Sequence, residues 1–219
     1  MKSYIVILFA ILGIAYAGDS IWCPNNNVST MNDEMRQKIL EKHNEYRYSL
    51  VFGLVKMKKG YARRASRMRQ LEYDCKAELS AYYSALHSCD SSPYSMDEYD
   101  ENRYVMEHKG DITKAADSWW SEIRGVVLDQ KDRKNDYSSK HKIPNFANMV
   151  WDTREKLGCA VAKCRTGKTH VVCHYAPKLR EEGKRMYWMG PPCARCSDYG
   201  DEFECFERKG FCVKNFASV

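Results

Sequence analysis

Beyond its first seventeen residues the sequence has no long apolar run, and this absence argues against a membrane anchor. The apolar run at 4–14 is itself too short to span a bilayer comfortably. It follows Lys2 and precedes the small residues of Ala-Tyr-Ala at 15–17, which is the order found in a secretory signal peptide. We therefore expect residues 1–17 to be a cleaved signal peptide and the rest of the chain to be secreted and extracellular.

The sequence also lacks the motifs of a nucleophilic enzyme. No serine lies in a Gly-x-Ser-x-Gly turn, the strand-to-helix turn that exposes the nucleophile in one large group of hydrolases. The cysteines are expected to be oxidised in a secreted chain, so they offer no thiolate. We expect no conventional enzyme activity, no catalytic residue and no cofactor.

A second zinc-ligand pair is missing as well. Cys193 and Cys196 have CxxC spacing, but no further CxxC or HxxxH follows them. All ten cysteines lie after the leader, and an even count in an oxidising compartment predicts up to five disulfides rather than a metal site. Asn27 heads the sequon Asn-Val-Ser, so we expect it to be exposed and glycosylated.

Positive charge is modest overall, at +6, but it is unevenly distributed. Residues 56–69 hold seven Lys or Arg and no acid. The favoured interpretation is a solvated helix face followed by a loop. The alternative is contact with an anionic surface or a heparin-like polysaccharide. Nothing beyond charge indicates nucleic acid, so no nucleic-acid partner is expected.

Hydrophobic periodicity predicts an α+β fold. Apolar residues recur at helical spacing in three segments, at 29–51, 74–89 and 111–127. Two short β-branched-rich runs at 157–164 and 169–176, joined by a Gly-containing turn, indicate a β-hairpin. Helices around a small antiparallel sheet form an α+β sandwich.

Between the third helix and the hairpin, residues 128–143 are polar and are expected to form an exposed loop. From Pro191 onward four cysteines fall within twenty residues. A tail of this length cannot bury a core alone, so we expect a main domain at 18–190 and a Cys-rich, disulfide-stapled extension at 191–219.

Three motifs carry a family resemblance. "HNEYR" (43–47), "NMVWDTREKLGCAVAKC" (148–164) and "VVCHYAP" (171–177) together resemble the CAP superfamily (SCP/TAPS). "YDC" (73–75) and the later cysteine spacing are most similar to the activation-associated secreted proteins of parasitic nematodes. The resemblance implies an α-β-α sandwich with a long cleft. It also implies the disulfides Cys159–Cys173, Cys89–Cys164, Cys193–Cys205, Cys196–Cys212 and Cys23–Cys75.

In many members of that superfamily the cleft holds two His and two acids that can bind a divalent metal. The resemblance places the acids at Glu101 and Glu122. It places the second His at Asn145, a neutral amide, and no His occupies the first position, because His87 precedes Cys89. We expect a degenerate site without metal, in which the two acids hydrogen-bond within the cleft; weak Ca²⁺ or Mg²⁺ binding is the alternative.

Residues Lys109-Gly110-Asp111 form a tripeptide used by antagonists of platelet integrins. Its Asp carboxylate would coordinate the receptor's metal. The favoured interpretation is simpler, because Asp111 can cap the third helix.

The sequence as a whole favours a secreted, non-catalytic protein that binds a host cell-surface receptor, with an integrin of platelet adhesion as the specific hypothesis. A sterol or fatty-acid carrier is the runner-up, since the superfamily includes such proteins. Metal-dependent hydrolysis is disfavoured by the two missing imidazoles.

Overall fold

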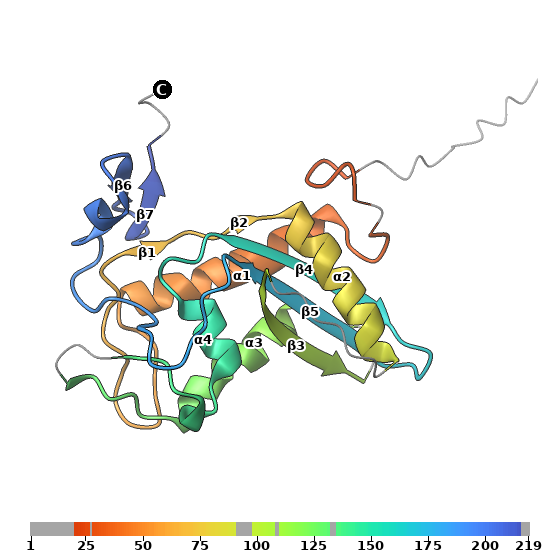
Figure 1. Cartoon of the computed structure of the whole chain (residues 1–219), viewed down its shortest axis with the longest axis horizontal. Helices are drawn as coiled ribbons and strands as arrows, with labels where there is room; N and C mark the ends of the chain where they lie inside the picture. The colour runs from red at the N-terminus through yellow and green to blue at the C-terminus, as the bar shows by residue number, and fades with distance from the viewer. Residues whose placement is uncertain (1–19, 27, 91–97, 108–109, 132–134, 216–219) are drawn as a thin grey trace, which may run out of the picture.

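A four-stranded sheet with helices on both faces forms the body of the molecule (Figure 1). The computed structural model describes residues 20–26, 28–90, 98–107, 110–131 and 135–215. The sheet order is β2-β4-β5-β3; β5 is antiparallel to both of its neighbours, β4 and β3, and β2 pairs in parallel with β4. The elements are α1 (Asp33–Val51), β1 (Met68–Arg69), β2 (Glu72–Tyr73), α2 (Cys75–Cys89), β3 (Asp100–Met106), α3 (Thr113–Ser121), η1 (Glu122–Gly125), η3 (Ser139–His141), α4 (Pro144–Val150), β4 (Lys156–Lys163), β5 (Thr169–Ala176), η4 (Cys196–Tyr199), β6 (Phe203–Phe206) and β7 (Phe211–Lys214).

Side-chain contacts identify the two faces of the sheet. The β5 residue His174 contacts α2 through Ser80, whereas its neighbour Tyr175 contacts α1 through His43. Because neighbouring residues of a strand point to opposite faces, α2 covers one face, and α1 lies on the other with α3 and α4. This arrangement confirms the predicted α-β-α sandwich.

The close approach of α2 to the sheet depends on Gly158. A Cβ atom at this position would lie 2.1 Å from the backbone nitrogen of Glu78 and 2.5 Å from the carbonyl oxygen of Asp74. Both atoms belong to backbone at the start of α2 and cannot move aside locally. The Gly-Cys pair that leads into the hairpin therefore sets how closely helix and strand pack.

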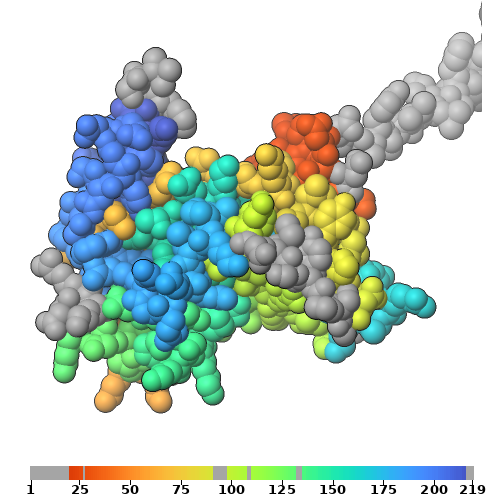
Figure 2. Space-filling view, viewed as in Figure 1, coloured from red at the N-terminus to blue at the C-terminus, as the bar shows by residue number. Residues whose placement is uncertain are grey.

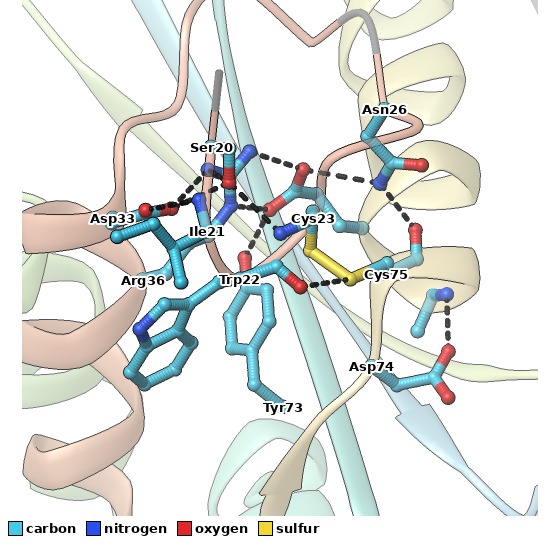
Figure 3. The surroundings of a disulfide bond; sticks show 12 residues. Ser20, Ile21, Trp22, Cys23, Asn26, Asp33, Arg36, Tyr73, Asp74 and Cys75 are labelled. Atoms are coloured by element: carbon cyan, nitrogen blue, oxygen red, sulfur yellow. Dashed lines mark hydrogen bonds and ion pairs between the residues drawn. A yellow bond between two sulfur atoms is a disulfide. The ribbon is translucent and has the colours of Figure 1, made fainter. Parts of the chain in front are cut away.

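Five disulfides tie the chain together, and within the described residues no cysteine is free. Figure 3 shows one of them, which joins Cys23 of the N-terminal segment to the first residue of α2. Beside it the buried Arg36 donates to Glu78 at 2.6 Å, and Asn26 donates to the Cys75 carbonyl. The pairings are those that the resemblance implies: Cys23–Cys75, Cys89–Cys164, Cys159–Cys173, Cys193–Cys205 and Cys196–Cys212.

The C-terminal extension packs on the main domain and does not stand alone. Its hairpin β6–β7 forms a second sheet with β1, which pairs in parallel with β7. Figure 2 shows the extension, in blue, at one end of the molecule. Across the described parts of the chain, no helix combines the length and apolar character needed to cross a membrane.

Two expectations about local structure were wrong. The cation-rich segment 56–69 contains no helix; it is an irregular loop with bridges at Lys56–Tyr61 and Ala65–Met189, ending in β1. The third helix ends at Ser121 and continues only as the 3-10 turn η1. The sequence also gave no sign of α4, whose seven residues are too few to show a period.

Candidate functional site

Glu122 and Asn145 form one half of the predicted cleft site. The Nδ2 group of Asn145 donates to Glu122 Oε1 at 2.6 Å. The backbone amides of Asn145 and Phe146 donate to Glu122 Oε2 at 3.0 and 2.9 Å. These are orphan amides of the first turn of α4, so Glu122 binds a helix terminus that carries partial positive charge.

Burial raises the pKa of the Glu122 carboxyl above its ordinary value, although three N–H groups donate to it. Desolvation of the charged form therefore outweighs the hydrogen bonds. Glu122 therefore caps the helix α4: both of its carboxylate oxygens accept hydrogen bonds from residues of that helix. A neutral amide and an engaged carboxyl offer no general base aimed at open space.

Glu101 lies elsewhere. It pairs across strands with His174, whose Nε2 is 2.9 Å from Glu101 Oε2, and both side chains face α2. His174 Nδ1 is 2.8 Å from the hydroxyl of Ser80, and Ser84 also bonds to the Glu101 carboxylate. Burial raises the pKa of Glu101, but hydrogen bonds from His174, Ser84 and Arg103 outweigh it, so the pKa is lowered overall.

Among the described residues, Glu122 is therefore hydrogen-bonded to Asn145, whereas the Glu101 carboxylate bonds to neither of them. His174 was the residue that sequence reasoning missed. The signal was present: residue 174 lies on a predicted strand, in alternation with the buried Tyr175. What the sequence lacked was the register that sets Glu101 opposite His174.

A buried amide network occupies the space between the two acids. Asn102 donates to the carbonyl of Asn145 at 3.1 Å and to the hydroxyl of Tyr175 at 2.9 Å. Asn148 donates to Asn102 Oδ1 at 2.8 Å. His43 accepts or donates at the same tyrosine hydroxyl at 2.8 Å, and burial lowers its pKa to about 4. The motif around Asn148 is therefore an internal scaffold for α1, α4 and the sheet.

The residues present do not fit the divalent metal that the superfamily resemblance implies. Asn145 supplies no imidazole, and both Glu122 oxygens already accept hydrogen bonds. The Glu101 carboxylate is occupied by His174, Ser84 and Arg103. No step of a reaction is assigned to a metal here.

One trio of metal-ligand side chains does occur among the described residues. Cys89, Cys164 and His170 place their ligand atoms within 4.8 Å of one another. Both sulfurs, however, are joined in a disulfide and carry no thiolate. The trio is a covalent crosslink beside a histidine.

The tripeptide is described only in part, because Lys109 lies outside the described residues, as does Asn27 of the sequon. Asp111 is exposed, and its Oδ1 accepts from the amide of Thr113, the first residue of α3, at 2.9 Å. That hydrogen bond lowers the pKa of Asp111. The carboxylate therefore supports the start of the helix while it stays charged and accessible.

Comparison with known proteins places this architecture in a family. The profile of "CAP: Cysteine-rich secretory protein family" matches residues 40–175. The chain is 41% identical over 209 residues to Hookworm platelet inhibitor 1 of Ancylostoma caninum, covering 94% of each chain. It is 31% identical over 186 residues to Ancylostoma secreted protein of the same organism, covering 80% of this chain and 43% of that one.

The fold agrees. The crystal structure of Hookworm Platelet Inhibitor superposes with a TM-score of 0.68 at 36% identity, over 86% of this chain and 95% of the other. The whole amide network, with Tyr175 and His43, and the hairpin disulfide fall within the matched segment. The chain therefore belongs to the CAP, or cysteine-rich secretory protein, family.

Proposed function

We propose that this protein is secreted, acts by binding rather than by catalysis, and blocks adhesion of host platelets through an integrin receptor. The observation that carries the proposal is the 41% identity, end to end, with a protein named Hookworm platelet inhibitor 1. The engaged state of Glu122 and Glu101 supports binding rather than chemistry, because neither carboxylate is free to act on a substrate.

Asp111 is the residue proposed to meet the receptor. An integrin ligand needs a carboxylate that reaches solvent and stays ionised. Asp111 is exposed, follows the flexible Gly110 and has a lowered pKa. Its bond to the Thr113 amide fixes the direction of the side chain and so lowers the entropy cost of docking.

The test is inhibition of fibrinogen-dependent platelet aggregation by the purified protein and three variants. Asp111→Asn keeps an acceptor for the Thr113 amide but removes the charge, so it should lose most inhibition while its melting temperature stays unchanged. Asp111→Ala should lose inhibition and also some helix stability, about 1 kcal/mol.

Asp129→Ala is the matched control. Asp129 is also exposed and also accepts from the amide two residues later, at 3.0 Å from Lys131. This variant should inhibit as well as the wild type. Full potency of Asp111→Asn would remove Asp111 from the proposal, and absence of inhibition by the wild type would overturn the platelet function itself.

Carriage of a sterol or fatty acid is a second candidate, favoured by one cavity. A cavity of about 420 Å³ beside Gly110 has an apolar part formed by Met31, Met35, Met106 and Val161, and polar residues complete its lining. Val161→Trp should fill it and abolish saturable uptake of a fluorescent fatty acid, whereas Val105→Trp, on the exposed edge of β3, should leave uptake unchanged. If the wild type shows no saturable uptake, the carrier function fails.

A further inference from the structure

A groove with three arginines lies where the loop after α1 meets the start of the C-terminal extension. Its volume is about 640 Å³. One wall comes from residues 52–66 and the other from residues 189–195. The cations are Arg63, Arg64 and Arg195, and among the described residues that line the groove there is no acid. The groove is separate from the helix cap, from the Glu101 pair and from Asp111.

Unpaired cations continue along the same loop. Of its seven Lys and Arg residues, Arg67 pairs with Asp152 at 3.0 Å and Arg69 pairs with Glu155. The other five are exposed and have no ion pair within the described part of the chain: Lys56, Lys58, Lys59, Arg63 and Arg64.

The outward direction of these cations follows from the packing of the residues between them. Val55, Met57, Ala62, Ala65 and Met68 are buried, and they anchor the loop to the core. The five exposed cations between these anchors project into solvent, whereas Arg67 and Arg69 are half-buried and ion-paired. The segment thus carries five exposed cations that it does not use in ion pairs with other described residues.

The opposite wall is rigid. The guanidinium of Arg195 lies 3.8 Å from the centroid of the Trp188 ring, and that of Arg185 lies 3.9 Å from it. Two groups so close to one centroid must occupy opposite faces, so the indole holds both arginines. Arg195 also bonds to Asp198 at 2.7 Å, and Asp198 is shared with Arg67, which in turn pairs with Asp152 at 3.0 Å.

Backbone bonds and disulfides fix the two walls against each other. Gly190 donates to the Arg64 carbonyl at 2.9 Å, and the Arg195 amide donates to the Ser66 carbonyl at 3.1 Å. Cys193 and Cys196, on either side of Arg195, are both disulfide-bonded. The groove is therefore preorganised, and little chain entropy remains to be lost when a ligand binds.

We propose that this groove binds a sulfated glycosaminoglycan chain through its sulfate groups. Guanidinium groups present paired N–H donors that match tetrahedral oxyanions, and Arg is preferred over Lys for that task. Three arginines along one groove suit a polymer with repeated anions better than a single small anion. A concave site suits a chain better than a flat membrane surface.

The experiment measures binding of a heparin octasaccharide by calorimetry at about 0.15 M salt, where weak surface electrostatics are screened. The variant Arg63→Gln/Arg64→Gln should weaken binding by about tenfold or more, because each guanidinium lost removes charge-assisted hydrogen bonds. Arg195→Gln should add to the loss. Because Arg63 and Arg64 are exposed, the melting temperature of the Arg63→Gln/Arg64→Gln variant should equal that of the wild type.

The matched control is Arg208→Gln/Lys209→Gln, which removes two exposed charges from the β6–β7 turn of the same extension. It should change affinity by no more than about twofold, as expected for screened surface charges that do not line the groove. Equal losses in the two double variants would mean that only net charge matters and would overturn the site.

Two further probes test the ligand class. The same octasaccharide without its sulfates should bind at least about tenfold more weakly, since its carboxylates alone remain. If it binds equally well, sulfate recognition is wrong. Tighter binding to phosphatidylserine vesicles than to the octasaccharide, lost in the Arg63/Arg64 variant, would assign the groove to a membrane and overturn the proposal.

Discussion

At the scale of single residues, Glu122 makes stability depend on pH in an unusual direction. Its pKa is raised, mainly by burial, so the folded protein holds this proton more tightly than the unfolded chain does. The contribution of Glu122 to stability is therefore full below its ordinary pKa of 4.5 and declines as the pH rises through the raised value. Glu122→Gln, which stays neutral, should gain stability relative to the wild type between about pH 4 and about pH 7.

Urea denaturation at both pH values gives the two free energies of unfolding. Glu101→Gln supplies a control with the opposite sign, because the pKa of Glu101 is lowered. Stability from Glu101 is present above its ordinary pKa and is lost as the pH falls through the lowered value, so this variant should lose most relative to the wild type near neutral pH. Parallel pH trends in the two variants would show that local burial does not control them.

At the scale of elements, the sequence predicted the helices and strands that have a strong local pattern and missed those that have a weak one. The helices α1 and α2 were predicted because their apolar residues recur at helical spacing, and the hairpin β4–β5 because two β-branched-rich runs flank a Gly-containing turn. The helix α4 has seven residues and depends on Pro144 at its start and on Glu122 from another element. A cap supplied from a distance leaves no local signal, which is why the sequence predicted Glu122 as a cleft acid but not as a helix cap.

The loop at 56–69 is the opposite case, in which the sequence predicted a helix that does not form. Its cations suggested a solvated helix face, but its buried residues are spaced irregularly, because they anchor a loop to the core. The candidate site was half predictable: the family resemblance placed Glu122 and Asn145 in one site, and the two side chains are hydrogen-bonded. The partner of Glu101 depends on strand register, which follows from tertiary packing of β3 against β5.

At the scale of the whole molecule, the five disulfides should contribute unequally. Cys23–Cys75 closes 52 residues, whereas Cys159–Cys173 closes 14 and Cys193–Cys205 closes 12. Because a crosslink restricts the unfolded chain more when its loop is longer, replacing Cys23 and Cys75 by Ser should cost about 1 kcal/mol more than replacing either short pair.

Thermal and urea unfolding of the three double variants gives the order directly. Cys193→Ser/Cys205→Ser should also loosen the wall of the groove that Arg63, Arg64 and Arg195 line, and so weaken heparin binding. Cys159→Ser/Cys173→Ser should leave heparin binding unchanged. Both variants remove a crosslink that closes a loop of similar length, so they should lose similar stability. A difference in heparin binding between them would therefore report a loss of preorganisation. If the two short pairs affect heparin binding equally, the Cys193–Cys205 disulfide does not hold Arg195 in place, and the rigidity of the groove must come from Cys196–Cys212, the backbone hydrogen bonds and the Trp188 stack.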